Sequence, residues 1–153
     1  MRSVSWTLST AVGVACCAKA QGGGAADGEL GPRVAILAGE LSGDALAAGL
    51  MRELRAERPQ IRFEGIGGPA MAAEGLDSLA PMESLSLMGL TEIIRHLPRL
   101  LRLRNELEQR WRSDPPALFV GVDLPDFNLS LERRLRAAGT TTIHYVSPTV
   151  WAW

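Results

Sequence analysis

Two polar loops near the C-terminal end of the sequence each follow a short apolar run. The run Leu118–Val122 leads into Asp123-Leu-Pro-Asp-Phe-Asn128, and the run Thr142–Val146 leads into Ser147-Pro-Thr149. In a parallel α/β sheet, ligands bind just beyond the carboxyl ends of the strands. Because both apolar runs are interpreted as strands, both loops lie where a binding or catalytic site is expected.

Asp123 is the strongest catalytic candidate. It ends an apolar run, and the following Pro125 restricts the loop. A carboxylate held there can act as a general base toward a substrate hydroxyl, and an aspartate that only bonds its own loop is the equal alternative. Asp126 is placed to cap the next helix. Asn128 can bond either a substrate or the loop backbone, and Ser147 offers a hydroxyl after the second run.

A third polar loop, Gly39-Glu-Leu-Ser-Gly-Asp44, follows the apolar run Arg33–Ala38. Its glycines permit a tight turn, and free amides at the start of a helix favour an anion or a cluster of hydroxyls. Glu40 is interpreted as functional, because a carboxylate at the mouth of a sheet contributes little to packing. Ser42 and Asp44 are candidates for ligand contacts or for a helix cap, and for Asp44 we favour the cap. The candidate residues of this loop are Gly39, Glu40, Ser42, Gly43 and Asp44.

The sequence excludes several familiar sites. The loop after Ala38 lacks the Gly-Lys-Ser/Thr of a P-loop, and its serine stands one place too late for a nucleophile elbow. Gly65-Ile-Gly-Gly68 is an incomplete dinucleotide fingerprint, which we interpret as a turn. His144 is interpreted as a packing residue of a strand, and the adjacent Cys16 and Cys17 have no second pair of ligands. We therefore predict neither a metal ion nor a cofactor.

The stretch from Met82 to Arg112 combines many aliphatic residues with interleaved arginines. An apolar face beside arginines is what a helix on a membrane surface needs. The same pattern is typical of a helix that packs on a core and exposes a charged face. The apolar positions exceed one narrow stripe, so contact with a membrane or acyl chains and packing within the fold remain equal alternatives.

Apolar runs and turn residues predict an α/β fold, a Rossmann-like parallel sheet with helices on both faces. The predicted strands cover residues 33–38, 61–65, 77–80, 118–122 and 142–146. The predicted helices run from the third loop to about residue 58, from residue 69 to residue 75, over 91–112 with a bend near Pro98, and over 126–138.

Size and composition indicate one globular domain preceded by a different segment. The chain has 153 residues, and its net charge of -1 does not point to nucleic acid. No apolar run approaches the roughly 18 residues that span a bilayer. Residues 1–31 are set apart as a leader or linker, which leaves 32–153 as the domain. A secretory signal, an organelle transit peptide and residues upstream of the true start are equal interpretations of the leader.

Five segments from about residue 33 to the end resemble the lipid-A-disaccharide synthase family, in the family's order and at compatible spacing. They are Gly39-Glu-Leu-Ser-Gly-Asp44, Gly67-Gly-Pro-Ala-Met71, Met88-Gly89, Val120-Gly-Val-Asp-Leu-Pro-Asp-Phe-Asn128 and His144-Tyr-Val-Ser-Pro-Thr-Val-Trp-Ala-Trp153. The last two are highly specific, whereas residues 1–31 have no counterpart in the family.

The resemblance implies the two-domain GT-B glycosyltransferase fold, with an incomplete N-terminal domain here and the C-terminal domain missing. It implies transfer of 2,3-diacylglucosamine from UDP-2,3-diacylglucosamine to the 6-hydroxyl of 2,3-diacylglucosamine 1-phosphate (lipid X), without a metal ion. The product is the β-1,6 disaccharide of lipid A.

The resemblance also assigns residues. The family's proposed general base matches Asp123, its active-site residues match Glu40 and Ser42, and residues 82–112 resemble its membrane and acyl-chain contact region. The implied substrate contacts are Gly39, Gly43, Asp44, Met88, Asn128 and Ser147.

Rival interpretations accompany this one. The main alternative is a truncated, non-catalytic form that binds lipid or a membrane surface through residues 82–112. A Rossmann-like nucleotide-binding protein is disfavoured by the incomplete glycine pattern. Without a second domain we expect the chain alone to be inactive, with exposed apolar surface around Trp151 and Trp153. A bacterial source implies the cytoplasmic face of the inner membrane, a plant or algal source implies a mitochondrion, and a secretory route ranks last.

Overall fold

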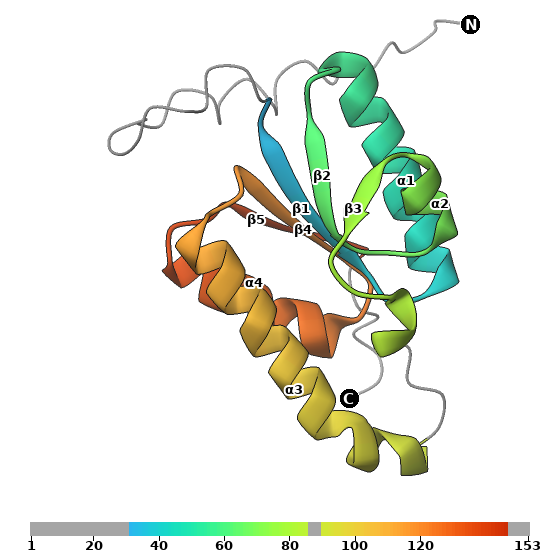
Figure 1. Cartoon of the computed structure of the whole chain (residues 1–153), viewed down its shortest axis with the longest axis vertical. Coiled ribbons are helices and arrows are strands. Elements are labelled where there is room, and N and C mark those ends of the chain that lie inside the picture. The colour runs from blue at the N-terminus through green and yellow to red at the C-terminus, as the bar shows by residue number, and fades with distance from the viewer. Residues whose placement is uncertain (1–30, 86–89, 147–153) are drawn as a thin grey trace, which may run out of the picture.

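The computed structural model describes residues 31–85 and 90–146, which form a five-stranded sheet in the order β3-β2-β1-β4-β5 (Figure 1). All four neighbouring pairs of strands are parallel. The predicted Rossmann-like α/β fold is confirmed. The bounds of β1 and β4 match the prediction, and those of the other three strands differ from it by one or two residues. The strands are β1 (Arg33–Ala38), β2 (Arg62–Ile66), β3 (Leu76–Ser78), β4 (Leu118–Val122) and β5 (Thr142–Tyr145).

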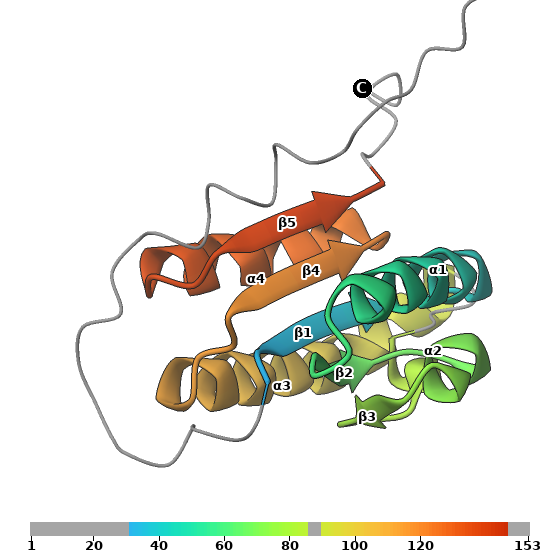
Figure 2. The ribbon, with the colours of Figure 1, turned by 90° about the horizontal axis from the view of Figure 1, so that it is seen from above.

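Helices cover both faces of the sheet (Figures 1 and 2). On one face lie α1 (Leu41–Glu57) and α2 (Pro69–Ala73), and on the other lie α3 (Leu90–Ser113) and α4 (Pro125–Ala137). A short 3-10 turn, η1 (Met82–Ser84), follows β3. The long helix predicted around Pro98 is confirmed as one element, with the proline inside it. Within 31–85 and 90–146, no helix combines the length and apolar character needed to cross a membrane.

The central strand β1 supplies both halves of the core. Its residues from Val34 to Ala38 are all buried, as expected for a parallel strand covered on two faces. Ile36 belongs to the cluster that includes Met51 of α1, whereas Leu37 belongs to the cluster that includes Trp111 of α3. This packing fixes the carboxyl ends of β1, β2 and β4 at one edge of the sheet, where the loops to α1, α2 and α4 begin.

A buried carboxylate fastens α3 to the sheet. Glu64 of β2 is 4% exposed and accepts hydrogen bonds from Nε1 of Trp111 at 2.6 Å and from Arg110 at 3.3 Å. Arg33 of β1 lies 3.5 Å from the same carboxylate. A buried charge is tolerated only with such partners. The bonds therefore hold the C-terminal end of α3 over β1 and β2.

Candidate functional site

Three loops meet at the carboxyl edge of the sheet, and two glycines allow two of them to approach closely. A Cβ atom on Gly39 would lie 1.8 Å from Cδ1 of Leu124. A Cβ atom on Gly43 would lie 3.3 Å from Cβ of Asp123. The structure therefore brings the predicted β1–α1 and β4–α4 loops together, and both glycines serve this contact.

Asp123 lies directly after β4 in a left-handed conformation with φ 62°, and Leu124 follows with φ 43°. Such conformations cost a non-glycine residue roughly 1–2 kcal/mol. Oδ1 of Asp123 accepts a hydrogen bond from the N–H of Leu124 at 2.9 Å, and its own N–H donates to the carbonyl of Tyr145 at 3.3 Å. The side chain is half-buried, and its Oδ2 has no hydrogen bond to another described residue. The loop thus fixes the carboxylate while leaving one oxygen available to a ligand.

Glu40 and Ser42 lie at the start of α1, in the loop that packs against Asp123. Both are exposed, and within the described part of the chain neither side chain has a hydrogen-bond partner. Glu40 occupies the N-cap position of α1 without a side-chain bond, so neither Ser42 nor Glu40 caps the helix through its side chain. Both side chains are available to a ligand, and their active-site role stays a prediction.

Asp44 does not cap its own helix, so that prediction is wrong. Its carboxylate is buried and accepts hydrogen bonds from the N–H groups of Gly68, Ala70 and Met71 at 2.8, 2.9 and 3.0 Å. It therefore holds the start of α2 and joins the first turn of α1 to the β2–α2 turn. The backbone engages both oxygens, which gives Asp44 a structural role, and its predicted substrate contact stays a prediction.

The start of α4 also differs from its prediction. Asp126 is exposed and makes no capping bond, because Leu124 occupies the N-cap position. Asn128 is fully buried, and its Nδ2 donates to the carbonyls of Asp123 at 2.7 Å and Val122 at 3.2 Å. Of the two alternatives for Asn128, bonding to the loop backbone is the one observed. Ser147 and Met88 lie outside the described residues.

Buried Glu132 of α4 and partly buried His144 of β5 form a pair near the β4–α4 loop. Nδ1 of His144 is 2.8 Å from Oε1 of Glu132, so this histidine has a specific polar partner as well as a packing role. Sequence reasoning missed Glu132, which stands among other charged residues of α4. The available signal was its spacing of four residues from Asn128, which puts the two side chains on the same face of the helix.

An apolar cavity of about 330 Å³ opens next to the Asp123 loop. Leu124 and Pro125 line it, so it begins at the residue after Asp123. Leu97 and Leu101 of α3 also line it and are 47% and 39% exposed. The other lining residues are Leu85, Leu100, Arg104, Asp126 and Phe127. A carboxylate beside such a cavity suits a ligand with a polar head and an aliphatic chain.

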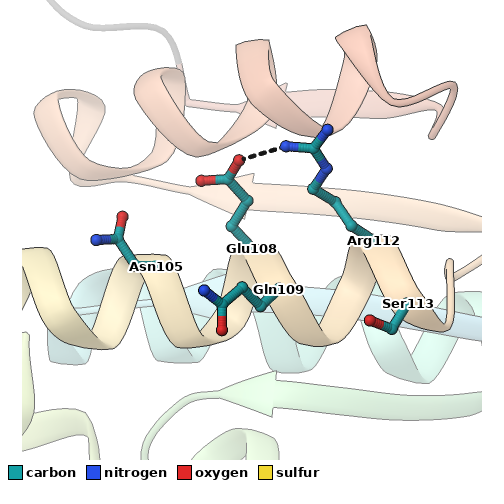
Figure 3. Close-up of a pocket in the computed structure, with 5 residues that line it drawn as sticks. All are labelled: Asn105, Glu108, Gln109, Arg112 and Ser113. Atoms are coloured by element: carbon teal, nitrogen blue, oxygen red, sulfur yellow. Dashed lines mark hydrogen bonds and ion pairs between the residues drawn. The ribbon is translucent and has the colours of Figure 1, made fainter.

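A second cavity, of about 410 Å³, is polar and lies along the C-terminal half of α3. Figure 3 shows its lining side chains: Asn105, Glu108, Gln109, Arg112 and Ser113. The hydrogen bond from Arg134 lowers the pKa of Glu108, burial opposes this effect, and the hydrogen bond from Arg112 lowers the pKa further. Since α3 ends at Ser113 and leads to the beginning of β4, this cavity lies away from the carboxyl edge, and we interpret its charges as structural.

In the described part of the chain, no three histidine, cysteine, aspartate or glutamate side chains are grouped to hold a metal ion. The arrangement at the carboxyl edge offers other chemistry. A fixed carboxylate can remove a proton from a hydroxyl, exposed polar groups on α1 can orient that ligand, and an apolar cavity can hold a chain attached to it.

Comparison with known proteins connects this arrangement to one family. The sequence pattern of the family described as lipid-A-disaccharide synthetase matches residues 34–153. A lipid-A-disaccharide synthase of Alkalilimnicola ehrlichii is 65% identical over 121 residues, which cover 79% of this chain and 32% of the relative. Those of Aeromonas hydrophila and Haemophilus influenzae are 56% identical over 121 residues and 55% identical over 122 residues. These matches cover 79% and 80% of this chain, and 32% and 31% of the relatives.

The chain thus spans about a third of the length of the curated relatives it matches. The matched region includes every candidate residue named above and the five strands, apart from Arg33 at the start of β1. The chain belongs to the lipid-A-disaccharide synthase family, a family of glycosyltransferases.

Proposed function

We propose that this chain carries the acceptor side of a lipid-A-disaccharide synthase. The reaction is transfer of 2,3-diacylglucosamine from its UDP derivative to the 6-hydroxyl of 2,3-diacylglucosamine 1-phosphate. The observation that carries the proposal is the fixed carboxylate of Asp123 next to an apolar cavity lined by Leu124 and Pro125. A diacylated sugar needs both features, because its hydroxyl must lose a proton while its acyl chains leave water.

In the proposed mechanism, Asp123 takes the proton from the acceptor hydroxyl as that oxygen attacks the anomeric carbon of the donor. The bond from the anomeric carbon to UDP breaks, and UDP leaves with the electron pair. Attack from the opposite side inverts the anomeric centre and gives the β linkage. Glu40 and Ser42, exposed at the start of α1, orient the sugar hydroxyls. No step requires a metal ion or another cofactor.

The acyl chains of the acceptor occupy the apolar cavity between α3 and α4 in this proposal. Exposed Leu97 and Leu101 continue the apolar surface outward from it. This arrangement supports the expected peripheral membrane contact of residues 82–112. The relatives named above are bacterial and give no support to a mitochondrial setting, so we place the protein at the cytoplasmic face of a bacterial inner membrane.

The test is a graft in which residues 34–153 replace the matching segment of the Alkalilimnicola ehrlichii relative. The graft is expected to release UDP and form the disaccharide when given both lipid substrates. Asp123→Asn removes the base and is expected to lower kcat by at least about 100-fold. Asp77→Asn, a matched change at an exposed position of β3, is expected to leave kcat unchanged. A graft with unaltered turnover after Asp123→Asn would refute the assignment.

The main alternative is a non-catalytic lipid-binding role, which the same apolar cavity also supports. We propose that the 153 residues alone do not release UDP, because they correspond to about a third of the matched relatives. Release of UDP by the purified chain would contradict this. A graft that binds vesicles of bacterial lipids but makes no disaccharide would favour the alternative.

A further inference from the structure

The backbone at Asp123 and Leu124 is strained, so contacts with neighbouring residues must stabilise its conformation. Both residues have positive φ values, at 62° and 43°, although neither is glycine. Strain of this kind persists only where surrounding contacts over-determine the conformation, and it is common at functional sites. The contacts that hold these two residues therefore also determine where the Asp123 carboxylate points.

Asn128 supplies most of these contacts. Its Nδ2 donates to the carbonyls of Val122 at 3.2 Å and Asp123 at 2.7 Å, and its backbone N–H donates to the carbonyl of Leu124 at 2.9 Å. The side chain thus bonds two consecutive carbonyls at the end of β4, and the bond to Leu124 is the first backbone hydrogen bond of α4. With those carbonyls turned toward Asn128, the N–H of Leu124 is left to bond the Asp123 carboxylate.

Close packing around Asn128 restricts its side chain. A Cβ atom on Gly121 would lie 2.9 Å from Cβ of Asn128 and 2.4 Å from Oε1 of Glu132, so only glycine leaves room for both side chains. Glu132 is in turn held by His144 of β5. Oδ1 of Asn128 is buried without a hydrogen-bond partner among the described residues. A buried acceptor without a partner lowers stability, and an apolar residue at this position would avoid that loss. The presence of an asparagine here is therefore explained by the two hydrogen bonds that its Nδ2 donates.

We propose that Asn128 is a positioning residue, which directs the Asp123 carboxylate toward the acceptor hydroxyl by fixing the carbonyls of Val122 and Asp123 at the end of β4. The Glu132–His144 pair and Gly121 form its rigid backing. This inference rests on the proposed function for the acceptor but assigns Asn128 no contact with substrate.

The experiment uses the chain itself and measures backbone amide signals by NMR with hydrogen exchange. Asn128→Asp keeps the shape but removes the two donated bonds, and Asn128→Ala removes the side-chain amide without adding charge. Asn105→Asp, at an exposed position of α3, is the matched control. The amide of Leu124 reports on its bond to Asp123, and the amides of Ile36 and Val120 report on the core strands.

Both Asn128 variants are expected to shift the Leu124 amide signal and to speed its exchange by at least about tenfold, while Ile36 and Val120 keep their protection. An unchanged Leu124 amide would overturn the proposal. Equal loss of protection at Leu124, Ile36 and Val120 would overturn it as well, because Asn128 would then be only a part of the core.

A kinetic readout in the grafted enzyme separates this inference from the proposed function. Asn128→Ala is expected to lower kcat about 100-fold with little change in KM, because the misplaced base acts only in the transition state. A rise in KM alone would assign Asn128 to substrate binding and overturn the inference. If the unaltered graft makes no disaccharide, the proposed function fails, while the Leu124 amide still decides whether Asn128 orients Asp123.

Discussion

At the scale of single residues, the glycines of the site are explained by close approach. Gly39, Gly43 and Gly68 each face a side chain that a Cβ atom would approach to 3.3 Å or less. The neighbours belong to other segments: Leu124 faces Gly39, and Asp44 of α1 faces Gly68. The glycines that the sequence analysis assigned to tight turns are thus also required by close contacts between segments.

Gly39→Ala is expected to destabilise the chain by about 1–3 kcal/mol, because the new Cβ overlaps the side chain of Leu124. Gly49→Ala is the matched control. Its Cβ meets nothing within 4 Å in α1, so the change is expected to stabilise by about 0.5–1 kcal/mol. Urea unfolding measures both. Adding Leu124→Ala should recover much of the loss at Gly39, and a Gly39→Ala chain as stable as the original would contradict the packing described.

At the scale of elements, the position of α3 depends on polar contacts at its C-terminal half. Glu64 binds it to the sheet through Trp111 and Arg110, and Glu108 binds it to α4 through Arg134 at 2.7 Å. The opposite half of α3 lines the apolar cavity beside Asp123. The polar contacts therefore position the wall of the candidate acyl-chain site.

Trp111→Phe is expected to lower the free energy of unfolding by about 1.5–3 kcal/mol. The ring keeps most of its packing against Phe119, but the buried Glu64 carboxylate loses the indole N–H, the nearer of its two hydrogen-bond donors described above. Phe127→Leu, an aromatic change on the cavity wall with no polar atom, is expected to cost less. Calorimetry or urea unfolding measures the free energy of unfolding of both variants. Equal decreases in the two variants would argue against a special role for the indole N–H.

The contact between α3 and α4 predicts a pH dependence. The pKa of Glu108 is lowered from 4.5, first by the hydrogen bond from Arg134, so its ionised form is favoured in the folded state. The resulting stability is present above the unfolded pKa and is lost as the pH falls through the lowered folded value.

Glu108→Gln is therefore expected to reduce the loss of stability between neutral pH and about pH 3 by no more than about 1 kcal/mol. Part of the acid sensitivity should persist, because Arg33 also lowers the pKa of Asp114. Glu106→Gln, an exposed change on the same helix, is the control. Unfolding curves over this pH range that coincide for Glu108→Gln and the original chain would refute the linkage.

At the scale of the whole molecule, one edge of the sheet is apolar. Among the described strands, β5 pairs only with β4. Ile143, Tyr145 and Val146 are 48%, 40% and 44% exposed, whereas His144 faces α4. The expected apolar surface at Trp151 and Trp153 lies outside the described residues, but β5 itself presents an apolar surface next to an open strand edge, a combination that favours association.

The chain is expected to associate as its concentration rises, and Ile143→Lys is expected to reduce this association, because a charge on an edge strand opposes pairing. Leu129→Lys, at a residue of α4 that is 44% exposed, should have a smaller effect. Sedimentation velocity over a range of concentrations measures the association of the chain and of both variants. A chain that stays monomeric throughout would contradict the prediction.

The sequence by itself determined the strands, the helices, the parallel sheet, the family resemblance and the position of Asp123, because apolar runs and turn residues are local patterns. Only the tertiary structure decided which polar groups meet. Asp44 bonds residues 24 to 27 positions away, and Trp111 bonds a carboxylate 47 positions away. Asn128 and His144 become linked to the candidate site only when α4 packs on β4 and β5. Side chains distant in sequence acquire these roles because packing removes them from water, and each buried polar group then requires a partner.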